Sequence, residues 1–247
     1  MTTKISYLLP TNRQKSNPEV LQQALDSINT QQTKYDYEIL IYSQDEISGN
    51  HIKWIKEDKP RGPIYGINLL AKKYAQGDYF VVLTDDQRFL NSIDLCINML
   101  ESDIFNKNRK LKICGLGCGN PCNLSRRGTR MGNVKHLQED WPQANILRFP
   151  VIHRDVMNNT LNGFIFHPEF YHAAGDIWLG YYLASIGEPC IEGPTQIMPI
   201  QTLHDPSYEI QDCDTAYALI TNFRNGYPNY VDLDFYEQYR KIRHEYE

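Results

Sequence analysis

The stretch from Tyr79 to Phe89 constrains the fold more than any other part of the sequence. Five apolar residues, Tyr79 to Leu83, run without a charge, and Asp85 and Asp86 follow after one threonine. An uninterrupted apolar run of this length is typical of a strand buried on both faces. Because charge is costly inside such a strand, we expect both aspartates where it leaves the core, at its carboxyl end. In open α/β sheets, ligands bind at that edge.

The first 116 residues alternate between strand and helix patterns. Helices are predicted to begin at Ser16, which has capping-box spacing to Glu19, at Gly62 with Gly77 as its stop, and at Asn91. Short links between alternating elements predict an α/β fold with a mostly parallel central sheet flanked by helices on both faces. The predicted strands are Lys4–Leu9, Glu38–Tyr42, Ile52–Ile55, Tyr79–Leu83 and Leu111–Leu116.

The second half of the chain is less regular. From Gly117 to about Leu161 the periodicity is poor, which predicts a long irregular segment. Beyond it we expect a helix from Asp176 to Ser185 closed by Gly187 and a strand over Ile197–Leu203. Further helices are expected over Thr215–Phe223 and Leu233–Glu247. Since no linker is evident, residues 1–247 are expected to form a single domain.

Charge and composition exclude several classes of protein. The net charge is −5, from 25 basic and 30 acidic residues, which argues against a nucleic-acid partner. No signal peptide and no apolar run of about 18 residues is present, so we expect a cytoplasmic protein without a transmembrane segment. Peripheral association with a membrane stays open, as does the role of the cysteines Cys114, Cys118 and Cys122, whose spacing is not typical of zinc sites.

The two aspartates after the apolar strand can be interpreted in two ways. Adjacent carboxylates invite a divalent cation that prefers hard oxygen ligands. Alternatively, Asp85 and Asp86 are solvated residues at a strand-to-turn junction. Two interpretations also exist for residues further along: Trp178 and Tyr182 are expected in the core, or alternatively one of these aromatic rings stacks on an acceptor molecule. Arg126, Arg127 and Arg130 either clamp a diphosphate or belong to a solvated loop.

Taken in order, these features resemble a known family. The order is a strand, Pro10–Arg13, a capped helix, a second strand, a Gly-rich helix start, and an apolar strand running into Asp85–Asp86. This resembles the nucleotide-binding half of GT-A fold glycosyltransferases, most nearly the family 2 group. The resemblance covers Lys4–Phe89, with a weaker match over Phe170–Gly187. It implies a Rossmann-like GT-A domain with a nucleotide-binding half over 1–116 and an acceptor-binding half with C-terminal helices over 117–247.

The resemblance implies metal-dependent, inverting transfer of a sugar from a UDP- or GDP-linked donor to a hydroxyl of a glycan, lipid-linked or small-molecule acceptor. Asp86 matches the last position of the family's Asp-x-Asp motif and is, with His204, the implied ligand of Mn²⁺ or Mg²⁺. Asp176 matches the second acid of the family's acidic pair, the general base. The implied nucleotide-binding residues are Pro10, Thr11, Arg13, Asp45, Gly62, Asn68 and Asp85.

Three departures from the family pattern keep alternatives open. Thr84 stands at the first position of the Asp-x-Asp motif, and Gly175 stands where the first acid of the acidic pair is expected. Ser43 and Gln44 stand where acidic residues usually read the base. One alternative is a sugar-phosphate nucleotidyltransferase, which the absence of glycine from Pro10–Arg13 disfavours. Others are a catalytically inactive nucleotide-sugar-binding domain and a retaining mechanism.

Overall fold

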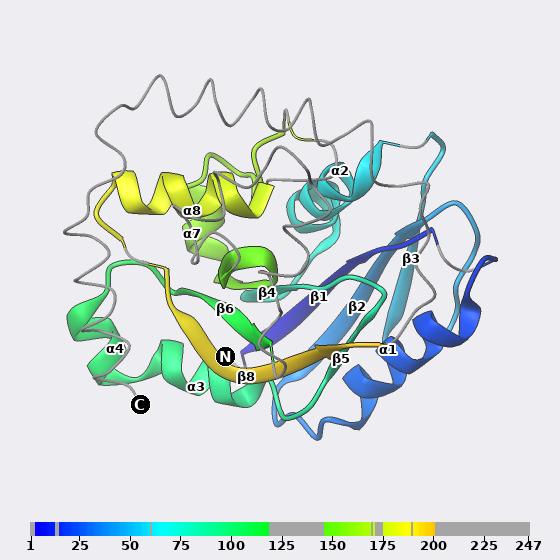
Figure 1. Ribbon diagram of the computed structural model, residues 1–247, viewed down its shortest axis with the longest axis horizontal. Helices are drawn as coiled ribbons and strands as arrows, with labels where there is room; N and C mark the ends of the chain where they lie inside the picture. The colour runs from blue at the N-terminus through cyan, green and yellow to red at the C-terminus, as the bar shows by residue number, and fades with distance from the viewer. Residues whose placement is uncertain are drawn as a thin grey trace, which may run out of the picture.

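The computed structural model describes residues 3–12, 15–59, 61–118, 146–168, 170, 175–188 and 190–200. Eight strands in this part of the chain form one sheet (Figure 1). Their bounds are β1 Lys4–Pro10, β2 Asp36–Ser43, β3 Ile52–Lys56, β4 Tyr79–Val82, β5 Gln87–Phe89, β6 Ile113–Cys118, β7 Pro150–His153 and β8 Glu192–Pro199. The strand order is β3-β2-β1-β4-β7-β6-β8-β5.

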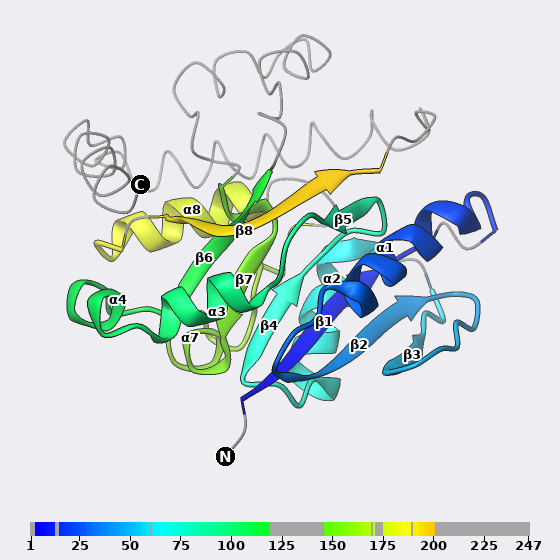
Figure 2. The same cartoon turned by 90° about the horizontal axis from the view of Figure 1, so that it is seen from below.

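Helices cover both faces of this sheet. One face carries α1, α3 and α4, and the other carries α2, α7 and α8 (Figures 1 and 2). Within the described residues, none of these helices combines the length and the apolar character needed to cross a bilayer. The bounds are α1 Pro18–Thr30, α2 Gly62–Leu69, η1 Leu70–Tyr74, α3 Asp94–Glu101, α4 Asp103–Asn108, η2 Ile146–Arg148, α7 Arg154–Asn159 and α8 Gly175–Ser185.

The sheet is mixed, with parallel pairing in its first half. β1 pairs in parallel with β2 and β4, β2 with β3, and β6 with β8. The antiparallel pairs are β4 with β7, β6 with β7, and β5 with β8. The predicted α/β fold with a mostly parallel sheet is confirmed. Each antiparallel pair involves β5 or β7, two short strands that the sequence patterns did not predict.

The apolar strand at the centre of the chain is buried on both faces, as predicted. Tyr79, Val81 and Leu83 pack with the residues of α1 and α3, whereas Phe80 and Val82 pack with those of α2 and α8. The exposed fraction of each of these five side chains is 1% or less. This alternation follows from the period of two along a strand, and it places the polar residues after Leu83 at the margin of both cores.

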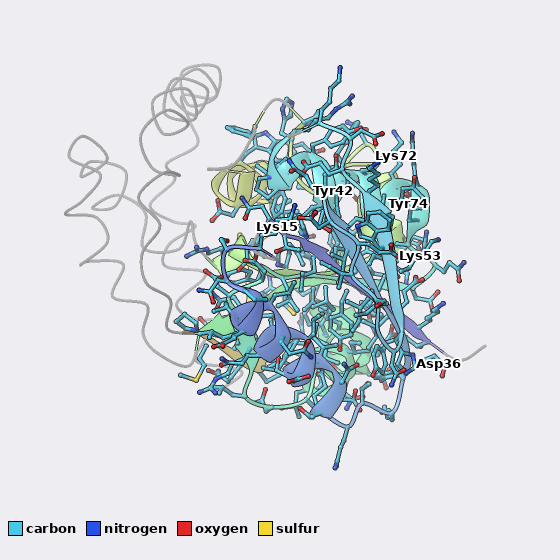
Figure 3. All side chains as sticks on the ribbon, turned by 90° about the vertical axis from the view of Figure 1, so that its right-hand side faces the viewer. Lys15, Asp36, Tyr42, Lys53, Lys72 and Tyr74 are labelled. Carbon is cyan, nitrogen blue, oxygen red and sulfur yellow. The ribbon has the colours of Figure 1, made fainter. Side chains whose placement is uncertain are left out.

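β3 forms one edge of the sheet. Figure 3 looks onto this edge, where Lys53 of β3 lies next to Tyr74 at the end of η1. The Lys53 ammonium is 5.2 Å from the centre of the Tyr74 ring. Charged side chains on an edge strand discourage pairing with another chain, and Lys53 is such a side chain on β3.

Two predicted helix boundaries are wrong. α1 begins at Pro18, one residue after Asn17, and no side chain caps it, so the capping box predicted for Ser16 is not formed. Proline at the first helical position suits this start because its missing N–H leaves no donor unsatisfied. The second predicted helix ends at Tyr74 rather than at Gly77. Gly77 is needed for a different reason: a Cβ there would lie 2.6 Å from the backbone nitrogen of Ser6.

The long irregular segment predicted from Gly117 to Leu161 is wrong over its last part. That part contains η2, β7 and α7, which have three, four and six residues. Elements this short carry too little periodicity to be recognised from sequence. β8 also begins five residues before the strand predicted over Ile197–Leu203. Residues 119–145 and the helices predicted after residue 214 lie outside the described residues.

Candidate active site

Three neighbouring parallel strands, β1, β2 and β4, end at one edge of the sheet. Pro10 at the end of β1 is level with Tyr42 of β2, and Leu8 is level with Val82 of β4. The N–H of Thr11 donates to the carbonyl oxygen of Tyr42 at 3.0 Å, so the parallel pairing continues past the end of β1. The predicted site residues that follow these strands therefore meet at this edge, as expected for an open α/β sheet.

The first of the two adjacent carboxylates is buried. Asp85 lies in the tight turn from Thr84 to Gln87, whose ends are joined by a 3.3 Å hydrogen bond from the Gln87 N–H to the Thr84 carbonyl. Its exposed fraction is 6%, and its Oδ2 accepts a hydrogen bond from the hydroxyl of Thr11. Burying a carboxylate is costly without such a donor. The bond therefore ties the end of β4 to the end of β1.

The second carboxylate is more accessible and is held by different donors. Asp86 Oδ1 accepts from the Thr84 hydroxyl at 2.6 Å and from the Gln87 side-chain amide at 3.1 Å. The carbonyl oxygen of Asp86 accepts from the N–H of Ile200, just after β8, at 2.7 Å. Asp86 is only half-buried, in contrast to Asp85. The turn thus points the two side chains at different partners.

The chemistry of these two side chains fits a divalent cation. Carboxylate oxygens are the hard ligands that Mg²⁺ and Mn²⁺ prefer, and Asp85 and Asp86 both follow the carboxyl end of β4. Among the described residues, no group of three or more His, Cys, Asp or Glu is close enough to form a complete metal site on its own.

At the end of β2, polar side chains form a linked group. The Ser43 hydroxyl donates to the carbonyl oxygen of Asp45 at 2.7 Å, and the Trp54 indole N–H donates to the Ser43 hydroxyl at 3.1 Å. The Asp45 carboxylate lies 2.8 Å from the Lys15 ammonium. Both ends of this ion pair are exposed, so it contributes little to stability. The pair does place a positive and a negative group beside the edge of the sheet.

Helix α2 begins beside the ends of β1 and β2. Gly62, the first residue of α2, has a φ of +77°, which a side chain would disfavour. A Cβ at Gly66 would lie 2.6 Å from a ring carbon of Tyr42 and 3.2 Å from Pro10. The absence of a side chain at Gly66 therefore allows α2 to pack closely against the ends of β1 and β2. The predicted Gly62–Asn68 segment is thus next to the Pro10 loop.

An aromatic pair lies on this side of the site. The ring centres of Tyr42 and Tyr65 are 6.1 Å apart, and the guanidinium of Arg61 lies 4.8 Å from the centre of the Tyr65 ring. Burial, with a smaller contribution from the Glu57 carboxylate, raises the pKa of Tyr42 to about 12. Tyr42 is therefore a neutral phenol at physiological pH. Tyr65 exposes 36% of its surface, which makes it the accessible member of the pair.

Asn68, a predicted nucleotide-binding residue, joins α2 to a distant loop. Its side-chain oxygen accepts from the N–H groups of Ile165 and Phe166 at 2.9 and 3.1 Å. Its amide nitrogen donates to the carbonyl oxygen of Phe166 at 2.7 Å. Asn68 is buried, so these bonds satisfy both ends of a polar side chain inside the protein. They hold the loop that leads toward α8.

Asp176 lies in the first turn of α8, next to the start of α2. A Cβ at the preceding Gly175 would lie 2.8 Å from Ile64 Cδ1 and 3.1 Å from Phe166 Cβ. This close approach explains why glycine, and not an acid, occupies that position. It also brings the half-buried Asp176 to the same end of the sheet as α2. The dipole of α8 favours the ionised form of a carboxylate at its amino end.

The aromatic residues that follow Asp176 belong to the core. The rings of Trp178 and Tyr182 stack with their centres 5.3 Å apart and an interplanar angle of 21°. Trp178 is buried in the core cluster shared by α2 and α8, and Tyr182 packs against that cluster. The Tyr182 hydroxyl donates to the carbonyl oxygen of Thr160 at 2.9 Å. The core interpretation is confirmed for Trp178, whereas Tyr182 is partly buried at the margin of the core.

Several predicted residues lie outside the described part of the chain. These are Arg13 of the implied nucleotide-binding loop, His204 of the implied metal site, and the arginines Arg126, Arg127 and Arg130. Cys122 is also outside it, whereas Cys114 is a buried free thiol.

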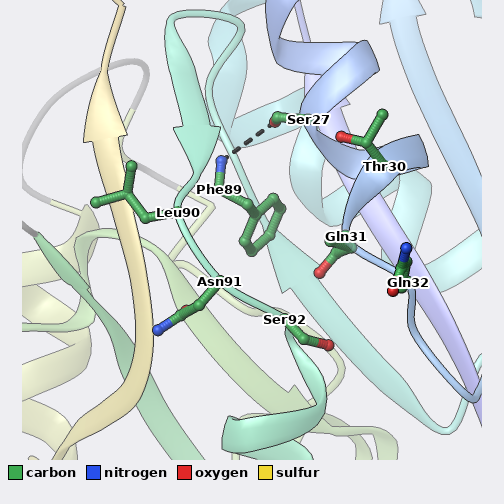
Figure 4. Close-up of a pocket in the computed structure, with 8 residues that line it drawn as sticks. All are labelled: Ser27, Thr30, Gln31, Gln32, Phe89, Leu90, Asn91 and Ser92. Atoms are coloured by element: carbon green, nitrogen blue, oxygen red, sulfur yellow. Dashed lines mark hydrogen bonds between the residues drawn. The ribbon is translucent and has the colours of Figure 1, made fainter.

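A pocket of about 280 Å³ lies elsewhere, between the end of α1 and the segment from β5 to α3 (Figure 4). None of the predicted site residues lines it. The Gln31 amide nitrogen donates to the Tyr7 hydroxyl at 2.7 Å, and the Gln31 oxygen accepts from the Ile93 N–H at 2.8 Å. Ser27 accepts from the Phe89 N–H at 3.2 Å. These hydrogen bonds of Ser27 and Gln31 join the end of α1 to β1, to β5 and to the start of α3. The lining residues are Ser27, Thr30, Gln31, Gln32, Phe89, Leu90, Asn91 and Ser92.

Sequence reasoning missed the groups that orient the predicted site residues. The contact between Arg61 and Tyr65 could have been found, because residues four apart face each other on a helix. The hydroxyl of Thr84 at the start of a turn was a further available signal, since Ser and Thr bond locally in turns. By contrast, the pairing of Thr11 with Asp85 spans 74 residues and has no local signature.

No family model matches the chain, and no curated protein matches it in sequence. Its structure is similar to solved structures. A mannosyltransferase from Pyrobaculum calidifontis, PcManGT, in complex with GDP-Man and Mn²⁺, aligns with a TM-score of 0.57 at 15% identity. That alignment covers 90% of this chain and 65% of the mannosyltransferase chain.

Two further structures align equally well. S. aureus TarS 1–349 in complex with UDP-GlcNAc has a TM-score of 0.58 at 13% identity, over 88% of this chain and 65% of that one. GalNAc-T7 with UDP, GalNAc and Mn²⁺ has a TM-score of 0.58 at 12% identity, over 98% of this chain and 55% of that one. This chain therefore spans about two thirds or less of each. At such low identity the likeness establishes the fold, and the protein therefore has the GT-A fold.

Proposed function

We propose that this protein is a metal-dependent, inverting glycosyltransferase that moves a sugar from a nucleoside-diphosphate donor to a hydroxyl acceptor. The observation that carries the proposal is the position of Asp85 and Asp86. They lie at the carboxyl end of β4 in a GT-A fold, each held by a threonine hydroxyl. Two structures with the same fold contain Mn²⁺ together with GDP-Man or with UDP and GalNAc, which supports a cation and a nucleotide sugar here.

Asp86 would hold the cation, together with His204. When bound, a divalent cation neutralises negative charge on the departing diphosphate as a Lewis acid. His204 follows Ile200 by four residues, so its Cα is at most about 14 Å from that of Ile200 along the chain. Because the N–H of Ile200 bonds to the carbonyl of Asp86, this reach is compatible with a shared site. Both Mg²⁺ and Mn²⁺ suit the carboxylates, and an imidazole ligand favours Mn²⁺.

Asp176 would act as the general base. The acceptor hydroxyl loses its proton as its oxygen attacks the anomeric carbon, and a carboxylate within hydrogen-bond reach can take that proton. The place of Asp176 in the first turn of α8 supports this role, because a helix dipole favours negative charge at its amino end. Direct attack from the face opposite the diphosphate inverts the anomeric configuration.

The nucleotide would lie along the ends of β1 and β2. Pro10, Thr11 and Arg13 would border the diphosphate and nucleoside, and Asp45 would face the base from the end of β2. Gly62 begins the helix that would close over the ribose, and Asp85 would contact the ribose. Asn68 would act by holding the 165–166 loop, in line with its three backbone bonds.

We also propose that the two halves of the chain bind different substrates. Residues 1–116 would form the nucleotide-binding half, and residues 117–247 the acceptor-binding half. The first range contains the strand ends described above, whereas α8 with Asp176 belongs to the second. The acceptor would be a glycan, a lipid-linked molecule or a small molecule that carries a hydroxyl.

The proposal is tested by turnover with a panel of UDP- and GDP-sugars and mixed acceptors, in Mn²⁺ or Mg²⁺. Release of UDP or GDP above background that EDTA abolishes supports it, and NMR of the anomeric proton distinguishes inversion from retention. A panel without turnover, and without a thermal shift for any donor, contradicts it. Donor binding without turnover, unchanged in Asp176→Asn, would instead indicate a catalytically inactive binding domain. Pyrophosphate release from a nucleoside triphosphate and a sugar phosphate would indicate a nucleotidyltransferase.

A further inference from the structure

Thr84 stands directly before the two aspartates and contacts the second of them. We propose that Thr84 is a positioning residue that fixes the carboxylate of Asp86 for the divalent cation, and thereby sets the affinity of the site for that cation. This inference rests on the proposed function in one respect, namely that Asp86 binds the cation.

The local backbone brings the two side chains together. The turn from Thr84 to Gln87 is closed by the hydrogen bond from the Gln87 N–H to the Thr84 carbonyl. Within this turn the Thr84 hydroxyl donates to Asp86 Oδ1 at 2.6 Å. This distance is in the range of charge-assisted O–H···O⁻ bonds, which are about twice as strong as neutral ones. The bond is therefore strong enough to select one orientation of the carboxylate.

A second donor acts on the same oxygen. The Gln87 amide nitrogen lies 3.1 Å from Asp86 Oδ1. Gln87 exposes only 6% of its surface and pairs with Pro199 of β8, so its side chain starts from a rigid position. On the other side, the Ile200 N–H holds the carbonyl of Asp86 at 2.7 Å. The side chain and the backbone of Asp86 are thus fixed from two different strands.

A comparison with Asp85 shows how these hydrogen bonds orient Asp86. Asp85 accepts from Thr11 at the end of β1 and is buried, whereas Asp86 accepts from Thr84 and is half-buried. Each of the two carboxylates therefore accepts a hydrogen bond from a different threonine, and the two carboxylates point in different directions. Groups that hydrogen-bond to a metal ligand orient it, and removing one typically costs about 10–100-fold in metal affinity. A hydroxyl does this without adding a negative charge beside Asp86.

The inference is tested by direct titration of the intact chain with Mn²⁺, with free Mn²⁺ detected by EPR. Parallel series contain Mn²⁺ alone, Mn²⁺ with UDP, and Mn²⁺ with GDP. Thr84→Val keeps the shape of the side chain and removes the donor, and we expect its Mn²⁺ affinity to fall by about ten-fold. Thr84→Ser restores the hydroxyl and is expected to recover most of that loss, which a purely steric role of Thr84 would not predict.

A matched control comes from a second Thr–Asp pair in the protein. The Thr33 hydroxyl donates to Asp94 Oδ1 at 2.5 Å, where the α1–β2 connection meets α3. Thr33→Val removes the same kind of bond and is expected to leave Mn²⁺ affinity unchanged. If Thr84→Val does not fold, Gln87→Met removes the second donor to Asp86 and is expected to lower Mn²⁺ affinity by a smaller factor. Thermal unfolding without metal verifies that each variant is folded.

The outcomes separate this inference from the proposed function. If Asp86→Asn loses Mn²⁺ affinity while Thr84→Val binds as tightly as wild type, the role of Thr84 is wrong and the cation site stands. An equal loss in Thr84→Val and Thr33→Val also overturns the inference. If Asp86→Asn binds Mn²⁺ as wild type does in every series, the cation site at Asp86 is wrong, and the role of Thr84 is wrong with it.

Discussion

The two ends of strand β4 both meet carboxylates, but different groups hold them. At its start, the Tyr79 hydroxyl donates to one oxygen of Glu101 at 2.5 Å, and the Lys112 ammonium lies 2.6 Å from the other oxygen. Past its end, threonine hydroxyls donate to Asp85 and Asp86, and a glutamine amide also donates to Asp86.

The different donors indicate different roles for Glu101 and for the aspartates after β4. Burial tends to raise the pKa of Glu101, but the hydrogen bonds from Lys112 and Tyr79 outweigh it and hold that pKa below its usual value. The positive charge that matches Glu101 is part of the protein, so this carboxylate serves the fold. At Asp86, a hydroxyl and an amide fix the orientation of the carboxylate, which is the property that the proposed cation ligand requires.

Asp86→Asn is the variant with the largest expected effect, and it tests the comparison between the carboxylates at the two ends of β4. Lewis-acid stabilisation is worth several kcal/mol, so the rate of sugar transfer with Mn²⁺ should fall about 10³-fold, since each 1.36 kcal/mol is a factor of ten. Glu101→Gln makes the same carboxylate-to-amide change at the other end of β4 and should leave the rate near wild type. Nucleoside-diphosphate release measures both. Similar losses in the two variants would break the comparison.

Asp176→Asn is expected to have the next largest effect. Removal of a general base should lower kcat by about 10²–10⁴-fold. Donor affinity, measured by calorimetry with Mn²⁺ present, should be unchanged, because the base acts on the acceptor. A variant with full activity would remove Asp176 from the mechanism. A matching loss of donor affinity would instead assign Asp176 to the nucleotide side of the site.

Two glycines of α8 test how tightly the start of this helix is packed against α2. A Cβ at Gly175 meets Ile64 and Phe166 at 2.8 and 3.1 Å, so Gly175→Ala should lower the free energy of unfolding by about 1–3 kcal/mol. At Gly180 the nearest atom is Cys190 Sγ at 3.6 Å. Gly180→Ala should therefore be neutral or add up to about 1 kcal/mol through helix propensity. Urea unfolding distinguishes them, and equal stability of both variants would contradict the packing of α8 on α2.

The smallest expected effect concerns pH. Because the pKa of Glu101 is lowered in the folded state, its contribution is present above the unfolded pKa of about 4.3 and is lost as pH falls through the folded value. The free energy of unfolding of Glu101→Gln should thus be lower than that of wild type at pH 7, and the two should converge below about pH 4. Urea unfolding across this range measures the gap. A gap that stays constant with pH would show that the charge of Glu101 does not matter.

The regions that could be predicted from sequence are those with local signals. The apolar run from Tyr79 to Leu83 predicted a strand buried on both faces, and the structure confirms it. β5 could not be predicted, because it has three residues and pairs with a strand about 110 residues away, Gln87 with Pro199. Its existence depends on β8 and not on its own propensity.

The candidate site shows the same division. The placement of Asp85 and Asp86 at a strand end follows from the cost of burying charge, which can be read locally. Asp86 is held partly by the adjacent Thr84 and Gln87. Other contacts come from distant segments, because Thr11 follows β1 and the Ile200 N–H follows β8. The bonds of Asn68 to Ile165 and Phe166 likewise depend on tertiary contact across nearly 100 residues. Sequence patterns indicate which residue types can act, whereas the contacts of Asp85 and Asn68 depend on distant segments.

The central claim is that Asp86 binds a cation that contacts the diphosphate of the donor. A crystal structure with Mn²⁺ and UDP or GDP, using the anomalous signal of manganese, tests this most directly. We predict a manganese peak bonded to the Asp86 carboxylate and to diphosphate oxygens, with Thr84 still donating to Asp86. A nucleotide bound at the ends of β1 and β2 with manganese away from Asp86, or a nucleotide bound elsewhere, would contradict the account.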